Sequence, residues 1–114
     1  MTVSTHILDA MAGHPAAGVS VGLSMLASDE SWLPVETAST DADGRLRFDA
    51  PTLAGVYRLT FATGPYFAAR SVDTFYPEVT ITFTVAEPLG TASAGHFHVP
   101  LLLSPFSYST YRGS

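Results

Sequence analysis

The sequence predicts an all-β protein, a two-sheet β-sandwich of about eight strands with one short helix. Short segments alternate between apolar and polar residues with a period of two, which is typical of strands that bury one face. Gly, Pro, Asp and Ser separate these segments at short intervals, as turns do. We find no repeat and no linker in the 114 residues, so a single domain spanning 1–114 is expected.

Four of the expected strands lie in the first half of the chain. Val3–Leu8 and Val19–Leu26 alternate clearly, and Trp32–Ala38 follows as a third strand. Arg45–Phe48 is a short fourth strand. It follows the turn Thr-Asp-Ala-Asp-Gly, in which Gly44 suits the positive φ of a tight turn.

The second half of the chain adds the helix and the remaining strands. Val56–Ala62 and Val79–Val85 both alternate, and the segment Pro65–Val72 between them predicts the single short helix. In the strand after position 95, alternation assigns a core face to four residues, Phe97, Val99, Leu101 and Leu103.

The same alternation predicts which polar side chains share the outer face. In the first strand, Thr5 and Ile7 point to the core, so His6 points outward. His96 and His98 point outward from the later strand, and Tyr111 from the last one. We therefore expect His6, His98 and Tyr111 to line one surface. Its apolar walls would be Leu8, Pro100 and Leu102.

Composition excludes several classes of function. The net charge of −5 argues against nucleic acid, which requires a cationic surface. All five basic residues are arginines, so Schiff-base chemistry is excluded, and the lack of cysteine excludes disulfides and thiolate metal sites. No run approaches the ~18 apolar residues of a membrane span, so no membrane association is expected. The N-terminal residues lack the features of a signal peptide, which makes the cytoplasm the expected location.

Four motifs together resemble a known family. They are Ser-Thr-His-Ile-Leu-Asp at 4–9, Thr-Asp-Ala-Asp-Gly-Arg at 40–45, Phe-Tyr-Pro-Glu-Val at 75–79 and the block from His96 to Ser114. Their order and spacing resemble those of the transthyretin-related 5-hydroxyisourate hydrolases over almost the full chain. The terminal Tyr-Arg-Gly-Ser is the tetrapeptide that separates these enzymes from the hormone carrier transthyretin.

The resemblance implies a transthyretin-like fold and a homotetramer, built as a dimer of dimers with active sites in the channel where the dimers meet. It implies hydrolysis of 5-hydroxyisourate to 2-oxo-4-hydroxy-4-carboxy-5-ureidoimidazoline in urate (purine) degradation, without a cofactor or a metal. The family's catalytic positions fall on His6, Arg45 and His98, and its terminal motif falls on Tyr111–Ser114. Ser107 departs from the pattern, because this position is usually glycine.

Each of these groups suits hydrolysis of a cyclic amide. An imidazole accepts a proton from water near neutral pH, so His6 or His98 is expected to activate the water, and sequence does not decide which. Arg45 is expected to bind the substrate's carbonyl oxygens and stabilise developing charge. Tyr111 and Arg112 are expected to contact the substrate, and the Ser114 carboxylate to position an arginine or a histidine.

Two alternatives stay open at this stage. His6, His96 and His98 would make a three-histidine zinc site of a hydrolase. A transthyretin-like carrier would instead hold an aromatic ligand in the intersubunit channel, although Tyr111 and Arg112 would obstruct it. Individually, Arg45 also suits a local salt bridge with Asp41 or Asp43, and His14 suits an ordinary surface position.

Overall fold

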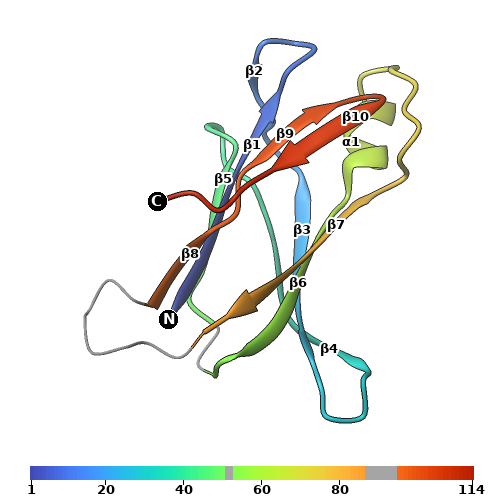
Figure 1. Cartoon of the computed structure of the whole chain (residues 1–114). Helices are drawn as coiled ribbons and strands as arrows, with labels where there is room; N and C mark the ends of the chain where they lie inside the picture. The colour runs from blue at the N-terminus through green and yellow to red at the C-terminus, as the bar shows by residue number, and fades with distance from the viewer. Residues whose placement is uncertain (51–52, 87–94) are drawn as a thin grey trace.

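Two β-sheets pack face to face in the computed structural model, which describes residues 1–50, 53–86 and 95–114 (Figure 1). The larger sheet has the order β10 (Ser107–Thr110), β9 (Leu101–Ser104), β1 (Thr2–Asp9) and β2 (His14–Pro15), and β5 (Arg45–Phe48) and β8 (His96–His98) also pair with β1. The smaller sheet has the order β4 (Trp32–Ser39), β3 (Ser20–Leu26), β6 (Gly55–Phe61) and β7 (Val79–Val85). The predicted all-β sandwich is confirmed.

Strand β1 is paired along both edges. Val3 and Ser4 pair with β5 in antiparallel orientation and with β8 in parallel orientation. Further along β1, Leu8 and Asp9 pair with both β2 and β9. Residues from four other segments of the chain are therefore held at fixed positions beside β1.

The sequence predicted one continuous strand where the structure has β8 and β9. The two are separated by Val99 and Pro100, because proline has no N–H to donate to a ladder. The gap stays attached to β1, since Val99 N–H donates to Ser4 O at 2.8 Å and Thr5 Oγ1 donates to Val99 O at 2.7 Å. With this split and the two-residue β2, the described residues form ten strands rather than about eight.

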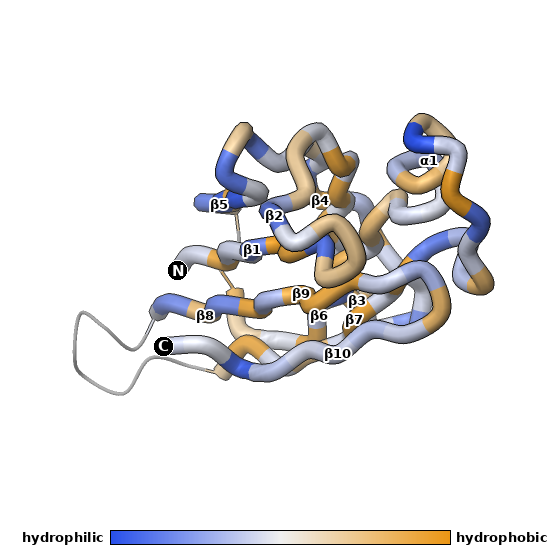
Figure 2. Tube along the Cα trace, turned by 90° about the horizontal axis from the view of Figure 1, so that it is seen from above, coloured by the Kyte–Doolittle hydropathy of each residue, from blue (hydrophilic) through white to orange (hydrophobic). Residues whose placement is uncertain are grey.

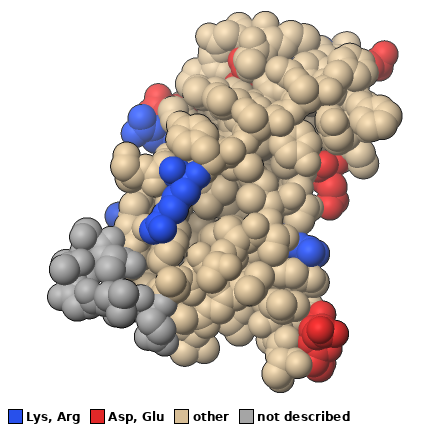
Figure 3. Space-filling model, in the orientation of Figure 1, with Lys and Arg blue, Asp and Glu red and all other residues tan. Residues whose placement is uncertain are grey.

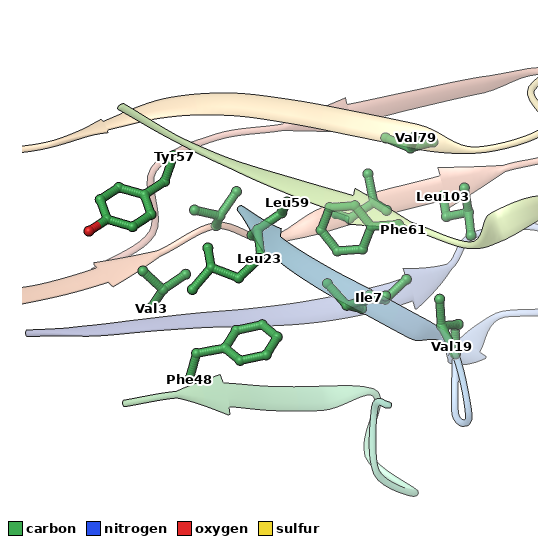
Figure 4. Packing of buried hydrophobic residues seen from close by; sticks show 14 of the residues in the cluster. Val3, Ile7, Val19, Leu23, Phe48, Tyr57, Leu59, Phe61, Val79 and Leu103 are labelled. Carbon is green, nitrogen blue, oxygen red and sulfur yellow. The ribbon is translucent and has the colours of Figure 1, made fainter. Parts of the chain in front are cut away.

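The core lies between the two sheets, where alternate residues of the strands meet (Figure 4). Thr5 and Ile7 are buried, as predicted for β1. The four predicted core residues near the C-terminus are buried as well, namely Phe97, Val99, Leu101 and Leu103. Figure 2 shows the same alternation as blue and orange segments along β8. The outward positions of these strands are therefore available for polar side chains.

The described residues contain one helix, α1 (Thr63–Ala68), which begins and ends before the predicted Pro65–Val72. Pro65 lies in the first turn, where its missing N–H costs no helical hydrogen bond. Ser71 has a positive φ of 56°, which ends the helical path before Val72. In the part of the chain that the structure describes, no helix has the length and apolar character needed to cross a membrane.

A buried polar contact joins α1 to the end of β1. The Asp9 carboxylate accepts hydrogen bonds from the N–H groups of Met11 and Ala12, and from the Tyr66 hydroxyl at 2.8 Å. Burial, followed by this bond to Asp9, raises the pKa of Tyr66 to about 12. Tyr66 therefore stays protonated and keeps donating to Asp9 across the neutral range.

Replacing Tyr66 with Phe should lower the free energy of unfolding by about 1–3 kcal/mol, because the buried carboxylate of Asp9 loses one donor. Urea unfolding followed by circular dichroism measures this loss. Tyr108→Phe is the matched control, since Tyr108 is 40% exposed and removal of its hydroxyl should stay within about 0.5 kcal/mol. Equal losses in the two variants would contradict the assigned role of Asp9.

Candidate functional site

A cavity of about 640 Å³ lies over the outer face of β1, β5 and β8. Its polar lining includes Ser4, His6, Asp41, Arg45, His98 and Ser114. Four of the six predicted site residues, His6, Arg45, His98 and Ser114, are thus brought together from separate segments of the chain. Concave sites with a few convergent polar groups are where ligands usually bind.

The turn before β5 positions Arg45 opposite His6. Gly44 has a φ of 73°, as the sequence predicted, and a Cβ at this position would lie 2.5 Å from the Ile7 carbonyl oxygen. Glycine therefore lets the turn approach β1 closely enough for Ile7 N–H to donate to Gly44 O at 2.8 Å. The resulting register pairs His6 directly with Arg45.

Asp41 holds the backbone of this turn rather than the guanidinium of Arg45. Its Oδ1 accepts hydrogen bonds from the N–H groups of Asp43 and Arg45, at 2.8 and 3.0 Å. The bond from Arg45 is the main cause of the lowered pKa of Asp41. Among the described residues, the one ion pair within 4 Å joins Arg47 and Asp49, so the alternative of an Arg45 salt bridge with Asp41 or Asp43 is wrong.

Two histidines of β8 are bonded to hydroxyl groups of β1. Ser4 Oγ lies 2.8 Å from His98 Nδ1 and 3.5 Å from His96 Nε2. Thr2 Oγ1 lies 2.6 Å from His96 Nδ1. The two rings are nearly parallel, with centroids 6.4 Å apart and an interplanar angle of 9°. His98 therefore has one ring nitrogen engaged by Ser4, while Nε2 has no partner within the described residues.

The pKa of His98 lies below the ordinary histidine value of 6.5. Burial is the main cause, and the positive charges of His96, His6 and Arg45 add to it. His98 is consequently neutral at physiological pH, which leaves a lone pair to accept a proton.

The C-terminal segment crosses β8 after leaving β10 (Figure 1). Gly113 N–H donates to His98 O at 2.8 Å. A Cβ at position 113 would overlap His98 Cδ2 and lie 3.3 Å from Pro100 Cγ, so only glycine fits between the tail and these rings. Pro100, predicted as an apolar wall of the outer surface, is buried within this chain, because the tail packs against it.

Tyr111 and Arg112 do not line the cavity of His6 and His98. They line a second hollow of about 320 Å³, which His98 also borders and whose apolar residues include Phe83 and Val99. The guanidinium of Arg112 lies 5.0 Å from the ring centroid of Phe97. Tyr111 therefore shares a hollow with His98, as alternation predicted, but not with His6, and it lies beyond the end of β10 at Thr110.

Sequence reasoning missed several cavity residues, among them Ser4, Ser39, Asp41 and Arg47. Alternation alone would have placed Ser4 beside His6 on β1, and Arg47 beside Arg45 on β5.

Within the described residues, no three His, Asp or Glu side chains are arranged to hold a metal ion. Arginines also do not gather into one basic patch on the face shown in Figure 3.

Comparison with known proteins gives the family. Residues 3–113 match the model of the HIUase/Transthyretin family, where HIUase denotes hydroxyisourate hydrolase. The chain belongs to this family. The 5-hydroxyisourate hydrolase of Salmonella dublin is 44% identical over 115 residues, which cover 98% of this chain and 80% of that protein.

Solved structures of the HIUase/Transthyretin family share the fold. The 5-hydroxyisourate hydrolase of Klebsiella pneumoniae is 39% identical, with a TM-score of 0.83 and coverage of 99% of this chain and 98% of that one. Sea bream transthyretin in complex with thyroxine is 35% identical, with a TM-score of 0.86 and coverage of 97% and 93%. Because both superpose well, the transthyretin-like fold is confirmed, and function has to be argued from the cavity.

The lowered pKa of His98 predicts the midpoint of its titration. Its imidazole C2–H resonance, followed by proton NMR, should titrate with a midpoint below 6.5. His96→Gln should raise this midpoint, because it removes a positive charge beside His98. The control His14→Gln should leave it unchanged, since His14 lies on β2 outside the cavity. A midpoint above 6.5 in the wild-type protein would contradict the assigned environment.

Proposed function

We propose that this protein hydrolyses 5-hydroxyisourate to 2-oxo-4-hydroxy-4-carboxy-5-ureidoimidazoline, a step of urate degradation. The observation that carries the proposal is the convergence of His6, Arg45, His98 and Ser114 on one cavity. A relative with 44% identity over nearly the whole chain bears the name of this enzyme. A cavity lined by three histidines, two arginines and carboxylates suits a polar heterocycle, and it suits the apolar ligand of a carrier poorly.

In the proposed reaction, His98 is the general base. Water loses a proton to His98 Nε2, and its oxygen forms a bond to the carbonyl carbon of the cyclic amide. The C–N bond then breaks, and the leaving nitrogen takes up a proton. His6 is proposed to deliver that proton, since it lines the same cavity from β1. The choice of His98 as base is supported by its lowered pKa and by the bond that engages its other nitrogen.

Arg45 is proposed to bind the substrate's carbonyl oxygens. Its guanidinium lines the cavity opposite His6 and is not paired with the carboxylates of its own turn. A planar guanidinium donates two parallel hydrogen bonds and stabilises the negative charge that develops on oxygen. Ser114 lines the same cavity, and its terminal carboxylate is proposed to accept hydrogen bonds from the substrate or from Arg45.

The active form is proposed to be a homotetramer, a dimer of dimers. Strands β7 and β10 end the two sheets without a further partner among the described residues. Large apolar side chains are also exposed on this chain, among them Phe75, Leu102, Phe106 and Tyr111. In such an assembly, Tyr111 and Arg112 are proposed to contact substrate in the channel between dimers.

We also propose a cytoplasmic location, since the proposed substrate is a small polar metabolite. Cell fractionation tests this location.

The purified protein should accelerate the decay of freshly generated 5-hydroxyisourate, followed by its ultraviolet absorbance. His6→Ala, Arg45→Ala and His98→Ala should each lower the rate by roughly 10² or more, because each removes a group that acts in the transition state. His14→Ala, outside the cavity, should leave the rate unchanged. The proposed function is rejected if the substrate decays only at its spontaneous rate in the presence of protein that light scattering shows to be tetrameric.

The position of the tail should matter for the same reaction. Gly113→Ala should lower kcat, because the added Cβ displaces either the tail or the His98 ring. Gly22→Ala is the control, since a Cβ there would meet Thr37 Oγ1 at 3.7 Å, an ordinary van der Waals distance. An alanine added after Ser114 should also lower the rate by moving the terminal carboxylate. Wild-type turnover in both tail variants would show that the tail has no part in the reaction.

A further inference from the structure

We propose that Ser4 is a positioning residue, which holds His98 in the tautomer with the proton on Nδ1 and the lone pair on Nε2. The inference rests on the proposed function, in which Nε2 takes the proton of the attacking water. Ser4 was not among the site residues predicted from the sequence.

Ser4 is itself held firmly on three sides. Its backbone pairs with Arg47 on β5 and with His98 on β8, and its carbonyl oxygen accepts the Val99 N–H at 2.8 Å. Ser4 therefore lies on the central strand of the set β5, β1 and β8, and its hydroxyl projects from the outer face of that set. At 2.8 Å from His98 Nδ1, Ser4 Oγ is close enough for a strong hydrogen bond. On the other side of the ring, Gly113 packs against Cδ2, so the imidazole cannot turn away.

The direction of this hydrogen bond follows from counting protons. A serine hydroxyl donates once and accepts twice. Ser4 Oγ lies near two imidazole nitrogens, His98 Nδ1 and His96 Nε2. When the hydroxyl proton points to His96 Nε2, Ser4 accepts from His98 Nδ1–H, and His96 Nδ1–H donates to Thr2 Oγ1. The three contacts are then all satisfied at once.

The reverse order of donors satisfies the same contacts but places a proton on His98 Nε2. The charge of Arg45 favours the first of the two orders, and the hydrogen bond to Ser4 then holds His98 in it. Arg45 and His98 line the same cavity, and the positive charge of Arg45 disfavours additional positive charge on the His98 ring. A lone pair on the second ring nitrogen is favoured by the nearby cation, whereas an N–H dipole there is disfavoured. The charge of Arg45 and the bond to Ser4 together favour a bare Nε2.

The bond from His98 Nδ1–H to Ser4 also persists when His98 becomes an imidazolium. It then has a charged donor, and bonds of that kind are stronger than neutral ones. Ser4 should thus stabilise the protonated base that forms as water is activated. Loss of a hydrogen bond to a charged group is expected to lower kcat by about 10- to 100-fold.

The test compares Ser4→Val with Ser4→Thr. Valine and threonine have nearly the same shape, but only threonine retains the hydroxyl. Ser4→Val should lower kcat by about 10- to 100-fold, and Ser4→Thr should retain most of it. Thr2→Val is the matched control on the same strand, because its hydroxyl contacts His96 alone, and kcat should stay at the wild-type value. Ser4→Ala replaces Ser4→Val if circular dichroism shows that the valine variant is unfolded.

A spectroscopic measurement separates positioning from a general loss of structure. Nitrogen-15 NMR of the His98 ring should show a protonated Nδ1 and an unprotonated Nε2 in the wild type and in Ser4→Thr. In Ser4→Val the two nitrogens should move toward a mixture of tautomers. A proton on Nε2 in the wild type would overturn the proposal, as would equal losses of kcat in Ser4→Val and Thr2→Val. If wild-type protein does not hydrolyse 5-hydroxyisourate, the proposed function fails, and the NMR result still decides the role of Ser4.

Discussion

The pairing of β1 along both of its edges is the constraint on which the site depends. His6 and Ser4 occupy successive outward positions of this strand. One edge brings Arg45 opposite His6, and the other brings His98 opposite Ser4. These partners lie about 40 and 90 residues away in the sequence, so local structure cannot bring them together. Instead, the pairing register of β1 with β5 and β8 determines which side chains lie next to one another. A shift of β1 by one residue in this register would point His6 and Ser4 into the core.

The histidines and arginines of the cavity come from β1 and from the strands paired with it. Burial, followed by the positive charges of the neighbouring histidines and Arg45, lowers the pKa of His98 and keeps it neutral. Asp41 lies at the cavity wall, but its carboxylate is occupied by two backbone N–H groups and so organises the turn. Because no carboxylate of the described residues forms an ion pair with Arg45, its guanidinium can bind a substrate. The electrostatics thus favour a neutral base beside a cation that faces the cavity.

Period-two alternation predicted the faces of β1 and β8 correctly, because one side of each strand must be buried. The composition of the turn before Arg45 identified Gly44, since a tight turn there requires positive φ. The pattern failed where regular strand ended. Val99 and Pro100 interrupt the ladder, and the tail after Thr110 lies outside regular strand, so the break between β8 and β9 and the covering of Pro100 by the tail were not predicted. The close approach of Gly113 to His98 is a contact between backbone and ring, which no spacing rule in the sequence encodes.

The same alternation explains how one fold accommodates unlike activities. A hydrolase and a thyroxine-bound transthyretin superpose on this chain with TM-scores of 0.83 and 0.86, so the backbone does not discriminate between them. Inward positions such as Ile7 and Phe97 are buried and maintain the sandwich. Outward positions on the same strands contribute little to that packing and can change chemistry without changing the fold. In this chain, the side chains on the outer face of β1, β5 and β8 include imidazoles, guanidinium groups and the hydroxyl of Ser4, and these groups set the chemistry of its cavity.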